Sequence, residues 1–349
     1  MSAHTTWGRV GSTDDRADGG GSGGFPGVTV AGITALISGL SVFVNSYGVH
    51  AIAAPSVYTT AKNVVATLVL ASCAMMARPI ARRRAASGAG RFVTVNRPTG
   101  PGTAPRPWRT WGPARWIGLA YVGVVGGGIA FVLFFDGLAD TTATPAAFWR
   151  DTLVLWVALL AIPLLRERPT RWNIAAVAVL VAGEISITGG VGHLSADRGE
   201  VFVLTATVLW AVEVVVAKLL LRDMATSAVA LVRMGVGSLA LVVYLGATGA
   251  LHLLWSLGAD QLGWALLTGL LLAAYVGTWM TALARARAID VTSVLVASAV
   301  VTALLQAAAG TRSLVPQALG LILILGGTAT VLWASHRARV PQGSDVVSA

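Results

Sequence analysis

The chain has 349 residues and a formal net charge of +10, yet only 11% of its residues are charged and 55% are apolar. Soluble domains are about 45–50% apolar and about 25% charged, so this composition, with a mean hydropathy of +0.74, excludes a single soluble domain. The basic residues lie between apolar runs and do not form a soluble basic face, which argues against nucleic-acid binding.

Residues 1–26 are polar and glycine-rich, and we expect them to form a disordered cytoplasmic tail. Ten apolar runs follow, each long enough as a helix to cross a hydrocarbon core of roughly 30 Å. We therefore predict an all-α integral membrane protein with ten transmembrane helices. The predicted spans are residues 28–49, 55–77, 115–136, 143–165, 172–190, 201–221, 226–248, 262–283, 291–309 and 315–334.

Most of the connections are short, but residues 78–114 are rich in Pro, Gly and Arg and are predicted to form a flexible basic loop. With the amino terminus inside, the inner loops and tails hold 20 of the 25 Lys and Arg residues, and only Arg198 and Arg312 lie outside. This bias predicts a multi-pass protein of the cytoplasmic (inner) cell membrane. Both termini, including a tail at 336–349, and the 78–114 loop are then cytoplasmic.

Two pairs of segments indicate an internal duplication. LLRERPTRWNIAAVAVLVAGEI (164–185) echoes AAGTRSLVPQALGLILILGGTA (308–329), and SVYTTAKNVVATLVL (56–70) echoes SAVALVRMGVGSLAL (227–241). We predict two five-helix repeats, 27–190 and 191–335. Because five is odd, the second repeat enters the membrane with reversed polarity. Such inverted repeats are typical of secondary transporters, whose halves exchange conformations to alternate access.

Three basic residues, Lys62, Arg150 and Arg233, lie inside predicted spans. Each costs about 2.5–3.5 kcal/mol at mid-helix before partners are counted, so such residues indicate a functional site. Lys62 and Arg233 occupy equivalent positions, each seven residues into its span, and are predicted to flank the midplane from opposite sides. There they suit an anionic or zwitterionic substrate. The alternative is that both only stabilise the bundle by pairing with acids or carbonyls.

Arg150 and Asp151 are adjacent, about 100° apart on a helix, so we expect each to find a partner on another helix or to face a cavity. Glu213 and Glu184 are the candidate partners, and either could carry a proton. For Glu213, a functional role and a structural ion pair both remain open. The weaker candidates for cavity lining are Asn63, Trp149, Trp210 and Tyr275.

The sequence contains no pattern that predicts catalytic residues, a metal site or a cofactor. Cys73 is the sole cysteine, and the five histidines show no ligand spacing. The glycines of the first 26 residues lack the Lys-Ser/Thr ending of a phosphate-binding loop. The chain is therefore not predicted to be an enzyme.

The motif in LLRERPTRWNIAAVAVLVAGEI resembles the junction of the fourth and fifth helices in the EamA-like branch of the drug/metabolite transporter superfamily. The matching residues are Glu167, Arg168, Pro169 and Gly183. Glu167 and Arg168 are expected to form a stabilising network at the helix end. VLWAVEVVVAKLLL (208–221), LVRMGVGSLAL (231–241) and AYVGTWMTAL (274–283) resemble the sixth, seventh and eighth helices. The resemblance covers about residues 28–335.

This resemblance implies a secondary transporter that exports a small organic metabolite or drug across the cytoplasmic membrane. Alternating access would be driven by a proton gradient or by solute exchange. One alternative is a non-transporting scaffold or sensor whose basic loop binds anionic lipid or a partner. Another is a membrane enzyme acting on a lipid-linked substrate, which would need a polar catalytic cluster that the sequence does not display.

Overall fold

The structure, a computed structural model, describes residues 27–52, 54–86, 111–141, 143–187, 197–311 and 314–337. All of the regular structure in these ranges is helical, so the predicted all-α class is confirmed. The predicted tail at 1–26, most of the tail at 336–349, and residues 87–110 of the predicted loop lie outside the described residues.

The elements divide at the gap between residues 187 and 197. The first part contains α1 (Gly27–Ala51), α2 (Pro55–Ala86), α3 (Pro113–Ala120), the π-helix η2 (Tyr121–Ile129), α4 (Ala130–Asp140), α5 (Ala143–Asp151), α6 (Leu153–Leu165) and α7 (Arg171–Ile187). The second part contains α8 (Arg198–Leu220), α9 (Thr226–Ala247), α10 (Leu251–Trp255), α11 (Ala259–Arg285), α12 (Ala288–Leu295), α13 (Ser298–Ala308), the 3-10 turn η4 (Val315–Gln317) and α14 (Ala318–Arg337).

Nine helical stretches among the described residues are long and apolar enough to cross a membrane, and they match nine of the ten predicted spans. The remaining predicted span, 172–190, coincides with α7, which has 17 residues, and residues 188–190 lie outside the described ranges. A multi-pass membrane protein is therefore supported, while the count of ten stays a prediction. Helix α2 also continues nine residues past its predicted end, because Ala and Arg favour helix and basic groups suit a helix C-terminus.

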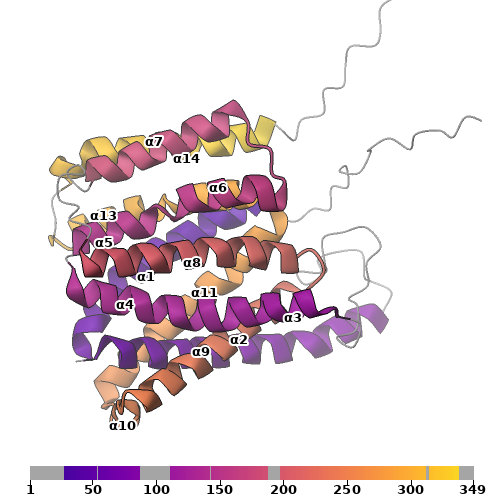
Figure 1. Cartoon of the computed structure of the whole chain (residues 1–349), viewed down its shortest axis with the longest axis vertical. Helices are drawn as coiled ribbons and strands as arrows, with labels where there is room; N and C mark the ends of the chain where they lie inside the picture. The colour runs from indigo at the N-terminus through magenta and orange to yellow at the C-terminus, as the bar shows by residue number, and fades with distance from the viewer. Residues whose placement is uncertain are drawn as a thin grey trace, which may run out of the picture.

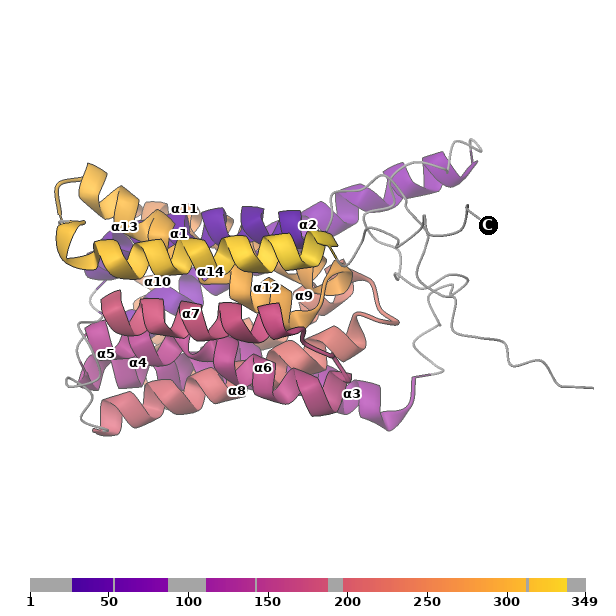
Figure 2. The same ribbon diagram turned by 90° about the horizontal axis from the view of Figure 1, so that it is seen from above.

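The helices lie side by side with their axes roughly aligned (Figure 1). The pair α7 and α14 forms one edge of the bundle, and α2 and α9 lie at the other. Between these edges α1 packs on α11, α12 and α13, while α8 packs on α4, α5 and α6. Helix α2 projects beyond the rest of the bundle at its C-terminal end (Figure 2).

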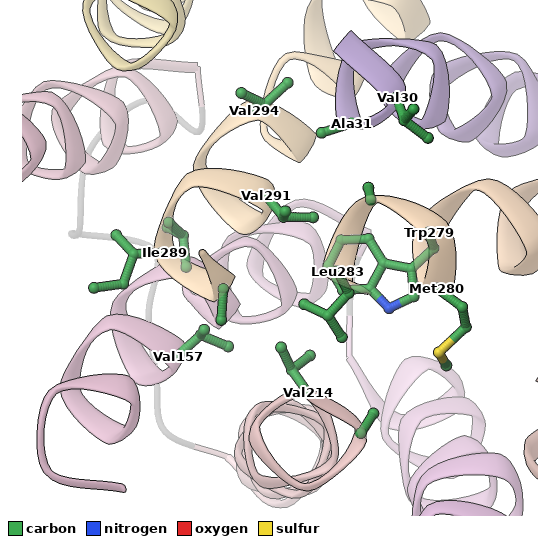
Figure 3. Close-up of a cluster of buried hydrophobic side chains, with 14 of the residues drawn as sticks. Val30, Ala31, Val157, Val214, Trp279, Met280, Leu283, Ile289, Val291 and Val294 are labelled. Carbon is green, nitrogen blue, oxygen red and sulfur yellow. The ribbon is translucent and has the colours of Figure 1, made fainter. Parts of the chain in front are cut away.

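A dense apolar cluster fills the bundle where α12 begins (Figure 3). Val214 of α8 and Val157 of α6 meet Leu283 of α11 and Val291 of α12 there, and all four are buried. Ala31 of α1 lies on the same cluster. Side chains from five helices thus pack together here, and we call this cluster the apolar plug.

The short break between α11 and α12 is held by charges of opposite sign. The carboxylate of Glu167 accepts hydrogen bonds from the backbone N–H groups of Ala288 (2.7 Å) and Ile289 (3.2 Å), at the positive end of α12. The ammonium of Lys218 donates to the carbonyls of Leu283 (2.6 Å) and Ala286 (2.5 Å), at the negative end of α11. Backbone groups that the break leaves unpaired are thereby satisfied.

A second set of bonds extends this arrangement to α7. Arg287 pairs with Asp290 through Nε and Oδ2 (2.9 Å), and its Nη2 donates to Oδ1 of Asn173 (3.2 Å). The amide of Asn173 in turn donates to Asp290 (3.0 Å). With Glu167 and Lys218 these three residues form what we call the junction network. Glu167 thus takes part in a network at the helix end, as predicted. Arg168 contributes its backbone carbonyl, which accepts a hydrogen bond from Arg287.

We predict that Glu167→Ala lowers stability by about 1–2 kcal/mol, because α12 loses the acceptor for its first two free N–H groups. The measurement is the Tm of the purified protein in detergent. Arg168→Ala is the matched control, since its side chain is exposed and the substitution leaves its carbonyl, the acceptor for Arg287, unchanged. Equal Tm values for the two variants would contradict this role of Glu167.

Candidate functional site

A cavity of about 230 Å³ lies among the helices of both halves. Six of the nine predicted site residues line it: Arg150, Asp151, Trp210, Glu213, Arg233 and Tyr275. Residues separated by up to 125 positions in sequence are thus brought to one place, since Arg150 lies on α5 and Tyr275 on α11. Lys62, Asn63 and Trp149 do not line this cavity.

The centre of the site is an ion pair between α9 and α8. Arg233 donates through Nε to Oε1 of Glu213 and through Nη2 to Oε2 (3.1 Å), so both carboxylate oxygens are engaged. Arg233 is 8% exposed and Glu213 3% exposed, so the pair is almost fully buried. The guanidinium also lies 5.9 Å from the ring centre of Phe131, within range of a cation–π interaction. A bidentate, buried pair of this kind holds both side chains in one orientation.

The π-helix η2 makes room for this pair. A Cβ on Gly126 would overlap the carboxyl group of Glu213, and a Cβ on Gly127 would overlap the carbonyl of Arg233. Gly237 of α9 meets the backbone of Gly127 in the same way. The carbonyl of Gly126 also accepts a hydrogen bond from Trp210 Nε1 (3.1 Å). The glycines therefore permit a backbone-to-backbone approach of η2 and α9.

Arg150 and Asp151 form a second ion pair in the cavity wall. The Nε and Nη2 atoms of Arg150 donate to Oδ1 of Asp151, at 3.0 and 2.8 Å. The expectation that these neighbours would not face each other was wrong. The arginine side chain is long enough to reach its neighbour across the roughly 100° between adjacent helix positions. The helix is interrupted at Thr152, directly after the pair. Glu184 of α7 interacts with this pair and hydrogen-bonds to Asp151.

Aromatic rings form much of the remaining wall. Phe131 meets Trp210 edge-on with a centroid distance of 5.2 Å, and Tyr275 stacks on Trp279 at 6.1 Å. The polar liners that the sequence analysis missed are Ser38, Ser41, Thr292 and Ser298. Hydroxyl residues occur in most of the spans, and nothing in their spacing indicates which of them face a cavity.

The other three predicted site residues have different surroundings. Lys62 binds Asn45 through Nζ and Oδ1 (3.1 Å), and Trp149 donates from Nε1 to Glu200 (2.9 Å). Asn63 is 1% exposed, and neither of its amide atoms has a hydrogen-bond partner among the described residues. Within those same ranges no group of His, Cys, Asp and Glu suits a metal ion.

Comparisons with known proteins give a family and a fold. The sequence model of one protein family, described as the EamA-like transporter family, matches this chain twice, over residues 98–189 and over residues 197–333. A solved structure titled only as the crystal structure of a protein aligns with 90% of this chain and 99% of its own, with a TM-score of 0.63 and 20% identity. At that identity the likeness is one of fold alone. No curated protein matches the chain.

We predict that Gly126→Ala destabilises the protein by about 1–3 kcal/mol, because the added methyl group overlaps the Glu213 carboxyl. Gly32→Ala is the control, since its Cβ meets nothing within 4 Å. The readout is Tm in detergent, which should fall for the first variant and stay level or rise for the second. A Gly126→Ala protein as stable as Gly32→Ala would refute the close packing around Glu213.

Proposed function

The chain belongs to the EamA-like transporter family, as its motifs predicted, and we propose that it is a secondary transporter that exports a small organic metabolite or drug across the cytoplasmic membrane. The observation that carries this proposal is the cavity, which lies among membrane-spanning helices of both halves and contains two ion pairs. Charged groups inside a membrane are expensive and usually mark a substrate or ion pathway.

The chemistry of the cavity suggests the class of substrate. Two guanidinium groups and two carboxylates give it both signs of charge, and each group already has a partner that a solute could replace. Aromatic rings from Phe131, Trp210 and Trp279 offer flat apolar contact. A volume of about 230 Å³ suits only a small molecule. A small zwitterion or anion with an apolar body fits these properties best.

Many alternating-access transporters are built from two related halves, and the pairing of α7 with α14 supports such a relation here. A Cβ on Gly183 would lie 2.8 Å from Ile324, and a Cβ on Gly327 would lie 2.8 Å from Leu180. Both Gly183 and Gly327, and Leu180 and Ile324, are separated by 144 positions. The Gly183–Ile324 contact and the Leu180–Gly327 contact are therefore equivalent: replacing each residue of one by its counterpart in the other half gives the other contact. The helices run antiparallel, which is the arrangement that an inverted repeat produces.

The opposite edge of the bundle gives an independent indication. Thr67 of α2 and Ser238 of α9 share a hydrogen bond of 3.0 Å between their hydroxyl oxygens. They are 171 positions apart, as are Lys62 and Arg233, whose segments matched in sequence. Two equivalent residues that touch each other lie on a pseudo-two-fold axis. We therefore propose that the two five-helix halves are inverted copies arranged about an axis through this contact.

A carboxyl pair in the cavity wall is our candidate for proton coupling. Asp151 lines the cavity, and Glu184 hydrogen-bonds to it. Arg150 binds Asp151 at 2.8 Å, so a guanidinium and two carboxyl groups meet at this point of the wall. In the proposed cycle a substrate displaces Arg150 from Asp151, and a proton then replaces the positive charge that the carboxyl groups lose. Solute exchange remains the alternative source of energy.

The ends of the described chain support a topology with both termini on one side. Gly27 packs against Ala286 beside the junction network, where a Cβ on Gly27 would lie 2.8 Å from the Ala286 nitrogen. Near the other end of the chain, Trp333 contacts Trp172 at the start of α7, with ring centroids 5.3 Å apart. The ends of α1 and α14 therefore share one end of the bundle, and the loop charges indicate that this end is cytoplasmic.

Two single-cysteine variants in a Cys73→Ser background test this orientation. Arg168→Cys lies beside the junction network, and Ser256→Cys lies in the turn before α11; both positions are exposed. A membrane-impermeant maleimide applied to intact cells should label Ser256→Cys and leave Arg168→Cys unlabelled until the membrane is opened. The reverse pattern would place both termini outside.

The role of the central ion pair is tested by removing both charges together. Arg233→Met alone leaves the buried Glu213 without its partner and should cost about 3–5 kcal/mol, whereas Glu213→Met with Arg233→Met should recover most of that stability. Solutes are first identified by their effect on Tm, from amino acids, amines, organic acids and drugs. We expect the double variant to fold but to lose flux of those solutes in proteoliposomes. Wild-type flux in the double variant would mean that the pair is only structural.

A further inference from the structure

Lys62 is a buried cation for which the described part of the chain supplies no carboxylate partner. Its side chain is 9% exposed, its Nζ donates to Asn45, and it lies over the rings of Tyr58 at 5.0 Å and Phe135 at 5.7 Å. The ion pairs found in the described structure do not include it. An amide oxygen and two ring faces stabilise an ammonium group, but they leave its positive charge uncompensated inside the membrane.

In the second half, the residue equivalent to Lys62 is Arg233, which has a carboxylate partner. The carbonyl of Lys62 packs against Gly269, as the carbonyl of its equivalent Arg233 packs against Gly127. The same separation of 171 positions that relates the two cations relates Glu213 to Val42. The backbone arrangement is thus repeated, but the position that holds the acid partner of Arg233 in the second half holds valine in the first.

Lys62 is linked to the cavity wall through two neighbouring side chains. Asn45, which accepts from Lys62, donates to the carbonyl of Ser41 (2.6 Å) and to the Ser41 hydroxyl (3.0 Å), and Ser41 lines the cavity. Phe135, whose ring faces the ammonium, stacks on the cavity residue Phe131, with ring centroids 6.4 Å apart. Asn45 and Phe135 therefore contact both Lys62 and residues of the cavity wall.

We propose that Lys62 is a second anion-binding site, which a small organic carboxylate reaches from the cavity when Asn45 and Phe135 turn aside. The carboxylate replaces Asn45 as the acceptor and supplies the negative charge that Val42 does not. Tyr58 and Phe135 flank the ammonium, so an anion with an aromatic or apolar body suits the site. That the anion is a transported solute rests on the proposed function; the binding itself does not.

The first test measures anion-dependent stability with benzoate as the probe. Benzyl alcohol and benzyltrimethylammonium serve as the neutral and cationic controls of similar shape. Benzoate should raise the Tm of the wild type and of Lys62→Arg, and the rise should fall by about half or more in Lys62→Met. In the Glu213→Met/Arg233→Met variant, the part of the benzoate-dependent rise in Tm that is due to Lys62 should remain. An equal rise in wild type and Lys62→Met, or a rise of the same size with benzyl alcohol, would overturn the proposal.

A second measurement needs no variant and so does not depend on how Lys62→Met folds. The chain has two lysines, Lys62 and Lys218, and Lys218 is held by two backbone carbonyls. Acetylation of the folded wild type by a sulfo-N-hydroxysuccinimide ester is followed by peptide mass spectrometry. Benzoate at about ten times its Kd should slow acetylation of Lys62 about tenfold and leave Lys218 unaffected. If Lys62 reacts only after unfolding, or benzyl alcohol protects it equally, the site does not exist.

These results separate the anion site from the transport proposal. Protection of Lys62 by benzoate in a protein that moves no solute would leave the binding site standing and reject transport. Solute flux that depends on Glu213 and Arg233, together with no protection of Lys62, would reject the second site and leave transport standing.

Discussion

The ion pair between Arg233 and Glu213 is the interaction on which the centre of this protein depends. Neither charge finds solvent in the hydrocarbon region, where one unpaired arginine costs about 2.5–3.5 kcal/mol or more, so each requires the other. Their bidentate contact requires α8, α9 and η2 to approach closely, and Gly126 and Gly127 supply the space. Arg233 and Glu213 also line the cavity. A substitution here therefore changes stability and the candidate site together, which is why the test removes both charges at once.

The two halves differ in the charged residues that they place around the cavity. By the separation of 171 positions, Glu213 corresponds to Val42, and by the separation of 144, Arg150 and Asp151 correspond to Val294 and Leu295. The first half thus supplies the Arg150–Asp151 pair where the second half is apolar. The second half supplies Glu213 where the first half has valine. In the proposed inverted repeat, a substrate would meet charges on different sides of the axis and could bind in one preferred orientation. In this proposal the symmetry of the two halves permits the change between conformations, and the charges found in only one half allow recognition of the substrate.

Much of the fold follows from the sequence because the membrane imposes simple rules. Runs of apolar residues predicted nine of the spans that the structure contains. The features that could not be predicted depend on backbone irregularity, such as the π-helix η2, and on side-chain direction. The long side chain of Arg150 pairs with Asp151, although a helix separates adjacent side chains by about 100°. Hydropathy likewise gives the depth of Lys62 but not the side of α2 from which its ammonium reaches Asn45.

The apolar plug and the junction network lie toward the end of the bundle that loop charges assign to the cytoplasm. In the proposed cycle the cavity must open at this end, so contacts that join the two halves here have to break. Glu167 belongs to the first half and binds the start of α12 in the second, whereas Lys218 binds α11 within its own half. Opening would therefore release Glu167 and leave Lys218 in place. The same carboxylate that caps α12 then also favours the closed state, since any opening leaves the first N–H groups of that helix without their acceptor.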